Sequence, residues 1–436
     1  MKLLRWGIYL TAVVPLVIFP QFISPFHFGK VVVFRSLVEI MAVFYFILIL
    51  RDRRWLPPRH ILLTIFALFT FVFGVTTILS VNQYLAFWGS LERMGGWWSF
   101  LHYLVYFVIL TGIFRTREDW LRLVKLTIFV GVLSALYGFG QKTDIEFFIG
   151  SGGRARIFGT IGNAALFAGY QIVNMFLALT LALSSWVPNK QKGYLWLAVL
   201  VNTIAVLMTA VRGSILGIAV GFLLFAVLYV LQSPSRTAKK VLGGLVVLAM
   251  LFVTLSLIFK NSQIIQGSSY LRRVADLSFT AHTVQTRFWA WHSGLSGWND
   301  NAKTILFGWG PENFNVPFSE NFNPRHFRGP GSETLFDRAH NMFIEVLVTM
   351  GVVGLGTYVA IFVIAINILW KKVRSKNLEP AIGIGLISLI VAYMIHNSFI
   401  FDTSANFLAF FTVLGFISFL TLRNEANPKS ETNSKF

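Results

Sequence analysis

Cysteine is absent from this chain of 436 residues, and charged side chains make up only 13% of it. The missing cysteines exclude disulfide bonds and thiolate chemistry, and they leave the redox compartment undetermined. The shortage of charge accompanies a hydrophobic content of 56%, which a soluble domain could not hide because its exterior has to stay polar. The composition therefore predicts an all-α, polytopic membrane protein.

The charges that are present are mostly positive, and the formal net charge is +19. Such a charge is also typical of nucleic-acid-binding proteins, but in a membrane protein it indicates loop lysines and arginines that face anionic lipid. We therefore expect membrane lipids as partners and no nucleic acid. The basic start, Met1 to Arg5, leads into an apolar run without a small-residue cleavage site, so we expect a retained first helix.

Long apolar runs predict about twelve transmembrane helices, since crossing the hydrocarbon takes about 20 apolar residues. The expected spans are residues 5–23, 30–50, 60–80, 97–114, 119–140, 162–186, 194–211, 213–231, 241–259, 340–370, 380–399 and 404–422. The chain then divides into nine helices (1–259), a large and partly helical outer loop (260–339), three further helices (340–422) and a disordered tail (423–436).

The connections between these runs alternate in character. Basic connections at 51–60, 115–119, 188–192, 233–240 and 371–376 fall on the same side as both termini. The positive-inside rule predicts that this side is cytoplasmic. The long loop then lies outside, and its tryptophans and polar residues favour a folded cap that partly rests on the membrane surface.

Ionisable side chains gather at the expected outer ends of helices and in outer loops. They are Arg35, Glu39, Arg93, Arg154, Arg156, Arg212, Arg287, Arg338, His340, Glu345 and His396. A coupled ion transporter usually keeps such groups near mid-membrane, where charge costs free energy. The distribution instead predicts a polar site at the outer interface, roofed by the long loop.

Arginines in three stretches are candidates for this site. Arg212 lies in "MTAVRGSILG", on a tight turn between two apolar segments that should fix its position; the alternative is an arginine that extends to lipid headgroups. Arg154 and Arg156 precede a glycine-rich helix start that could hold phosphate, although the spacing is not that of a P-loop and an ordinary basic loop is the alternative. In "QTRFWAWHSGL" the apolar spacing predicts an amphipathic helix with Arg287 near its start, or else a solvated surface arginine.

His340 stands where the long loop returns to the membrane. Asp337 is a plausible N-cap three residues earlier, and the positive end of a helix dipole disfavours imidazolium. A neutral imidazole can accept a proton from a hydroxyl group, as a general base must. Asn341 or Glu345 could support it, and the alternative is a capping or interfacial histidine.

Several arginines and one histidine at the outer face suit a lipid-linked diphosphate. Arginine binds phosphate oxygens in a bidentate manner and stays charged, so it can stabilise a departing diphosphate. His340 would deprotonate the acceptor hydroxyl, and Arg93 and Arg338 join Arg154 and Arg156 as candidate diphosphate ligands. The sequence has no His/Asp/Glu cluster at metal-ligand spacing, so we expect no metal and no cofactor.

The same stretches resemble the O-antigen ligase/O-antigen polymerase superfamily of bacterial membrane glycosyltransferases. They are "WGSLERMGGWWSFLHY" (88–103), "RIFGTIGNAALFAGY" (156–170), "TAVRGSILG" (209–217), "QTRFWAW" with "ILFGWGPENF" (285–314), and "AHNMFIEVLVTMGVVGLG" (339–356). The resemblance implies a GT-C-type fold in the inner membrane, a large periplasmic loop and transfer of glycan from undecaprenyl diphosphate. It assigns active-site roles to Arg212, Arg287 and His340. The stretch "GTIGNAA" departs from the Asn-Pro that many relatives have.

The acceptor stays open between lipid A–core for a ligase, a growing glycan for a polymerase, and a protein hydroxyl. A flippase for lipid-linked sugars is the alternative of another class, but it would favour two similar halves joined by a central cytoplasmic loop. A structural subunit of an envelope complex is a further alternative. It would not require Arg212 and His340 to converge.

Overall fold

The computed structural model describes residues 1–150, 156–232, 243–244, 262–263, 267 and 282–422, and within these residues it is helical without β-strands. The α-helices are α1 (Lys2–Val13), α2 (Phe28–Arg51), α3 (Ile61–Ile78), α4 (Gln83–Trp88), α5 (Trp97–Ile113), α6 (Arg117–Gly140), α7 (Ala164–Leu183), α8 (Asn189–Met208), α9 (Arg212–Gln232), α13 (His282–Trp298), α14 (Ala302–Phe307), α15 (Asn315–Glu320), α16 (Met342–Arg374), α17 (Pro380–Asn397) and α18 (Ser404–Leu422). Three short 3₁₀ turns lie at Val14–Leu16, Arg53–Trp55 and Pro324–His326.

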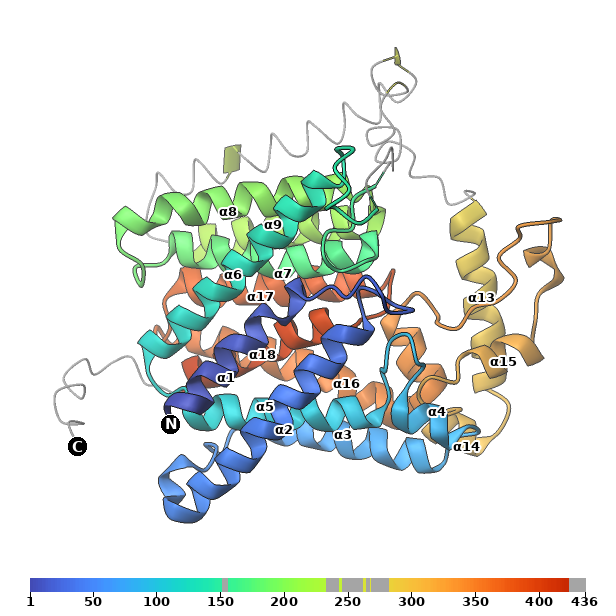
Figure 1. Cartoon of the computed structure of the whole chain (residues 1–436), viewed down its shortest axis with the longest axis horizontal. Helices are drawn as coiled ribbons and strands as arrows, with labels where there is room; N and C mark the ends of the chain where they lie inside the picture. Colours follow the sequence, from blue (N-terminus) through green and yellow to red (C-terminus); the bar gives the residue numbers. More distant parts are fainter. Residues whose placement is uncertain (151–155, 233–242, 245–261, 264–266, 268–281, 423–436) are drawn as a thin grey trace.

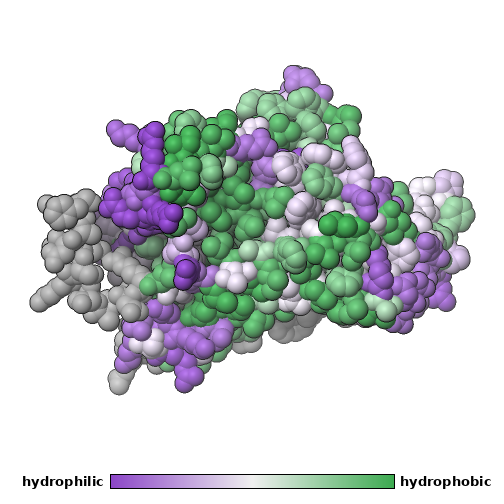
Figure 2. Space-filling model, turned by 90° about the horizontal axis from the view of Figure 1, so that it is seen from below, coloured by the Kyte–Doolittle hydropathy of each residue, from purple (hydrophilic) through white to green (hydrophobic). Residues whose placement is uncertain are grey.

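Three helices form the centre of a bundle. The most apolar 18-residue stretch is 94% buried inside the protein in α7, 78% in α17 and 83% in α18. The corresponding stretch is only 28% buried in α2 and in α8. Figure 1 shows α7, α17 and α18 between an upper layer containing α8 and a lower layer containing α2 and α3. On the face that Figure 2 shows, hydrophobic residues cover much of the middle, and hydrophilic residues gather mainly at the two ends. This is the surface of a membrane protein.

Within the described residues, nine helices are long and apolar enough to cross a membrane. The expected span 5–23 is wrong as a single helix, because α1 has only 12 residues and ends before Pro15, which lacks an N–H and clashes with a preceding turn. The expected span 97–114 appears as α5, with 17 residues. The expected span 241–259 lies largely outside the described residues.

The long helix α16 is interrupted at Gly351, whose φ of 67° and ψ of −172° are not helical. The break leaves the carbonyl groups of Val348 and Thr349 available to residues outside the helix. They accept hydrogen bonds from the backbone N–H groups of Trp309 (3.1 Å) and Gly310 (2.8 Å). The backbone of Leu306 approaches so closely that a Cβ atom on Gly351 would lie 2.2 Å from its carbonyl carbon. The expectation of one continuous helix over 340–370 is therefore corrected to a helix broken where the cap docks.

The cap consists of α13, α14 and α15, at the end of the bundle opposite the N-terminus (Figure 1). It has a small core of its own, formed by Ala290, Phe314, Phe318, Phe336, Ala339 and Val348. Val348 belongs to α16 and Ala339 immediately precedes His340. The cap core is therefore continuous with the membrane helix and with the chain that carries the candidate base.

Candidate active site

His340 stands just outside α16. The cap of this helix is Asn341, whose side chain accepts hydrogen bonds from the N–H groups of Phe343 (3.0 Å) and Ile344 (3.2 Å). The expectation that Asp337 caps the helix is therefore wrong. His340 has a φ of 51°, in the left-handed region where non-glycine residues are uncommon and where strain often accompanies function.

The carbonyl oxygen of Arg338 lies 3.2 Å from Nδ1 of His340. A carbonyl oxygen can only accept a hydrogen bond, so Nδ1 of the neutral ring carries the proton and Nε2 keeps its lone pair. The imidazole is further held edge-on between the rings of Phe336 and Phe401, at centroid distances of 5.6 and 5.4 Å. The ring is thus oriented with Nε2 as the basic nitrogen.

The pKa of His340 is lowered to about 4, first by burial and then by the positive charge of Arg287, with a smaller contribution from Arg93. The side chain is therefore neutral at neutral pH, which is the state that the sequence predicted. The causes found here are burial and neighbouring arginines, whereas the sequence had suggested the positive end of the helix dipole.

Two hydrogen bonds, one from α13 and one to α16, hold the backbone at Ala339. Nε1 of Trp291, in α13, donates to the Ala339 carbonyl at 2.6 Å, and the Ala339 N–H donates to Oε2 of Glu345, in α16, at 2.7 Å. Trp291 lies one turn after Arg287 on the same helix, so the contact also sets the distance between Arg287 and the His340 segment. Both backbone groups of Ala339 are therefore held, which fixes the chain immediately before the strained residue His340.

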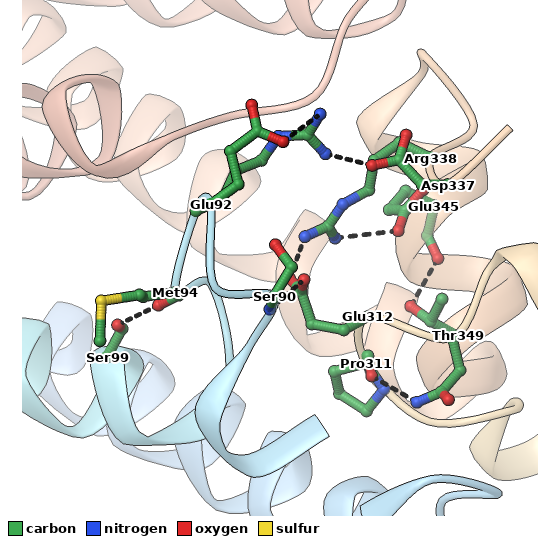
Figure 3. A network of polar contacts seen from close by, with 12 residues as sticks. Ser90, Glu92, Met94, Ser99, Pro311, Glu312, Asp337, Arg338, Glu345 and Thr349 are labelled. Atoms are coloured by element: carbon green, nitrogen blue, oxygen red, sulfur yellow. Dashed lines mark hydrogen bonds and ion pairs between the residues drawn. The ribbon is translucent and has the colours of Figure 1, made fainter. Parts of the chain in front are cut away.

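Arg338 is the centre of a buried ion-pair network (Figure 3). Its guanidinium pairs with Glu312 and, at 3.1 Å, with Glu345, and its side chain is only 14% exposed. Burial works to lower the pKa of Arg338, but the carboxylates of Glu312 and Glu345 outweigh it and raise the pKa. The charge of Arg338 is thus balanced within the protein, and its contacts support positioning of the His340 segment.

Arg93 pairs with Asp337 at 2.5 Å, from the connection between α4 and α5. Its guanidinium also lies over the Phe401 ring, 4.7 Å from the centroid, in a cation–π contact. Phe401 therefore contacts both Arg93 and His340, with Arg338 more distant at 5.9 Å. Phe401, in the α17–α18 connection, thus brings together three candidate site residues, Arg93, Arg338 and His340.

Arg287 lies in the first turns of α13, as its sequence spacing predicted. Its Nη1 donates to the carbonyl oxygen of Phe399 at 3.0 Å. Burial lowers the pKa of Arg287, and the distant carboxylate of Glu333 opposes this. No carboxylate among the described residues is in ion-pair contact with Arg287, in contrast to Arg93 and Arg338. It is a desolvated cation with donor groups still available to an anion.

Arg212 begins α9 after a turn of three residues that follows α8, so the expected tight turn is present. The next residue, Gly213, packs under Phe399, and a Cβ atom there would lie 2.6 Å from Phe399 Cβ. Arg156 reaches the same turn, since its Nε donates to the carbonyl of Thr209 at 2.7 Å. The structure thus brings Arg156 and Arg212 to one turn, and Phe399 links that turn to Arg287. Arg154 lies outside the described residues.

Sequence reasoning missed the segment from Phe399 to Asp402. Asp402 anchors it in the bundle by accepting hydrogen bonds from Tyr393 (2.8 Å) and from the side-chain amides of Asn397 (2.7 Å) and Asn406 (3.2 Å). Burial raises the pKa of Asp402 to about 6, and these hydrogen bonds oppose the rise. Sequence reasoning also missed Glu312; the stretch "FGWGPENF" contains it, but nothing local indicates that it pairs with Arg338.

A cavity of about 50 Å³ lies beneath the network, lined in part by Glu312, Arg338, Glu345, Phe401 and Asp402. A space of this size is large enough for a few water molecules and too small for a glycan. Neither His340 nor Arg212 lines it, so this cavity is not a space that the two share.

No group of three or more His, Asp or Glu side chains within the described residues is arranged to hold a metal ion. The chemistry that the described side chains can supply is proton transfer at His340 and anion stabilisation by arginine.

Comparison with known proteins gives one family. Residues 197–359 match the family model described as O-antigen ligase, a region that includes Arg212, Arg287, Arg338 and His340. A search of curated proteins found no match.

Proposed function

We propose that this protein, which belongs to the O-antigen ligase superfamily, transfers a glycan from undecaprenyl diphosphate to an acceptor hydroxyl at the outer face of the inner membrane. The observation that carries the proposal is that a neutral, oriented His340 lies within the electrostatic influence of Arg287, a half-buried cation that has no carboxylate in contact among the described residues. A base and an anion site side by side are what displacement of a diphosphate requires.

The reaction has one bond-forming and one bond-breaking event. The acceptor oxygen forms a bond to the anomeric carbon of the donor sugar while its proton passes to Nε2 of His340. The bond from the same carbon to the diphosphate oxygen breaks, and its electron pair leaves with the diphosphate. Arg287 and Arg212 stabilise the charge that develops there, with Arg156 beside them. Arg93 and Arg338 keep His340 in position, and no metal ion is required.

Binding of the donor should also raise the pKa of His340. The positive charge of Arg287 helps to keep the pKa of His340 low in the free protein. A bound diphosphate would offset that charge, so the pKa of His340 would rise towards neutrality when a proton has to be accepted. A general base is most effective when its pKa lies near the working pH.

The side of the membrane follows from charge. The N-terminus and the basic α2–α3 connection lie at one end of the bundle, and the cap helices α13, α14 and α15 lie at the other (Figure 1). The positive-inside rule favours a cytoplasmic location for the first end, which supports our proposal that the site opens outward and that both termini are cytoplasmic. For the acceptor we favour lipid A–core, as for a ligase, over a growing glycan or a protein.

The test is a transfer assay with purified protein in lipid, a polyprenyl-diphosphate-linked glycan and each acceptor in turn, read by mass spectrometry. His340→Ala is expected to abolish product while the protein stays monodisperse. His292→Ala is the matched control, because His292 is an exposed histidine on α13. Product from His340→Ala at the level of the control would refute the role of the base.

A further inference from the structure

Residues 156–160 form a short segment that reaches the turn carrying Arg212. Nε of Arg156 donates to the carbonyl of Thr209 at 2.7 Å. Thr209 directly follows α8, at the helix end where carbonyl groups lack partners within the helix. The turn itself contains Ala210 with a φ of 50°, a left-handed conformation that is uncommon for a residue with a Cβ atom. Arg156 therefore supports a strained turn at the point where the chain leaves α8.

A buried glutamine holds the 156–160 segment from α6. Gln141 directly follows this helix and is buried. Its Oε1 accepts hydrogen bonds from the N–H groups of Phe158 and Gly159, both at 3.0 Å. Its Nε2 donates to the carbonyls of Gly159 at 3.1 Å and Ile149 at 3.0 Å. Both donors and both acceptor sites of the amide are thus used on backbone groups, which fixes the segment relative to the end of α6.

A buried lysine holds the same segment from α2. Nζ of Lys30 donates to the carbonyls of Val17 (2.6 Å), Phe26 (2.7 Å) and Thr160 (2.7 Å). Three carbonyl acceptors match the three N–H donors of an ammonium group. Lys30 lies in the first turn of α2, where the helix dipole disfavours a cation, and burial of a charge costs free energy. Its position is therefore accounted for by the three carbonyl groups that it holds.

We propose that Gln141 and Lys30 are positioning residues for Arg212. They fix the backbone of the 156–160 segment, and this segment in turn holds Thr209, three residues before Arg212. The inference rests on the function proposed above, in which Arg212 stabilises the departing diphosphate. Because a displacement of about 1 Å that starts far from the chemistry can cost about 100-fold in rate, a looser segment should lower transfer.

A double-mutant cycle tests this assignment. Gln141→Leu removes four hydrogen bonds but keeps a side chain of similar size, and it is expected to lower kcat/KM for transfer by about 10- to 100-fold. In an Arg212→Gln background the same change should cost less than about twofold, because no cation is left to position. Gln171→Leu is the matched control, since Gln171 is buried in α7 and donates to the carbonyl of Gly131 in α6 at 3.2 Å. Any loss that it causes should be the same in both backgrounds.

Amide hydrogen exchange in nanodiscs gives a readout that does not depend on transfer. Gln141→Leu should raise the exchange rate of residues 209–213 several-fold and leave residues 301–320 of the cap unchanged. Thr160→Val removes only a hydroxyl group, which donates to the carbonyl of Pro15 at 2.8 Å. It should have the same effect to a smaller degree, and it carries the test if Gln141→Leu does not fold.

Two results would overturn the assignment. One is unchanged exchange at residues 209–213 in the variants, and the other is an equal loss of transfer from Gln141→Leu with and without Arg212. Absence of transfer by the wild-type protein would instead refute the proposed function. Hydrogen exchange alone would then decide whether Gln141 holds the turn.

Discussion

Nδ1 of His340 donates to the carbonyl oxygen of Arg338, two residues earlier in the chain. The same arginine is held through its side chain by Glu312 and Glu345. The ion-pair network therefore acts on the candidate base through the backbone, because any shift of Arg338 displaces the carbonyl that selects the tautomer of His340.

The pH dependence of transfer should reflect the low pKa of His340. The neutral imidazole is the active form, so activity is present above the pKa and lost below it. With a pKa of about 4, kcat/KM should be level from neutral pH down to about pH 5 and fall only below that. The profile of kcat should fall at a higher pH, since the bound diphosphate offsets Arg287. A midpoint of kcat/KM near 6.5 in the wild-type protein would contradict this assignment.

Replacement of Arg287 should remove anion stabilisation and should also raise the pKa of His340. We expect Arg287→Gln to lower kcat by about 100-fold, the typical loss when one donor to a developing anion is removed. The pH midpoint of kcat/KM should move upward, because a positive charge beside His340 is gone. Steady-state kinetics over a pH range measure both effects. Arg325→Gln, an exposed arginine of the cap, should change neither.

Transfer activity should depend on the aromatic ring of Phe401. Phe401→Leu removes the cation–π contact of Arg93 and the edge contact of His340 while leaving an apolar side chain. A cation–π contact at a desolvated site contributes up to about 2 kcal/mol, so we expect activity to fall about tenfold. Phe401→Tyr keeps the ring and should retain most of the activity. Equal activity of the leucine and tyrosine variants would show that the ring does not position the base.

Gly351 should be needed for folding. In Gly351→Ala a Cβ atom would meet the Leu306 backbone at 2.2 Å, at a φ of 67° that alanine rarely adopts. We expect a marked fall in melting temperature and loss of activity, because α14 can no longer dock on α16. Gly356→Ala, on the same helix with open space around the added methyl group, should be neutral or stabilising by up to about 1 kcal/mol. Thermal unfolding followed by intrinsic tryptophan fluorescence compares the two.

Most helices could be predicted from the sequence, because hydrophobic runs of membrane-spanning length are a local signal. The exceptions have identifiable causes. Pro15 ends α1 early. The break at Gly351 is stabilised by hydrogen bonds from Trp309 and Gly310, which are distant in sequence. A glycine within an apolar run does not by itself indicate such a partner.

The sequence by itself determined that the chain is a helical membrane protein, and it identified Arg212, Arg287 and His340 as residues to consider. Charge in an apolar chain is rare enough to be informative wherever it occurs. Only the tertiary structure decided which cations are already neutralised. Arg338 and Arg93 have carboxylate partners, while Arg287 has none in contact among the described residues. Ion pairs and aromatic contacts join residues 308–312 and 399–402 to the segment of a distant histidine, and such pairings depend on packing that no local pattern encodes.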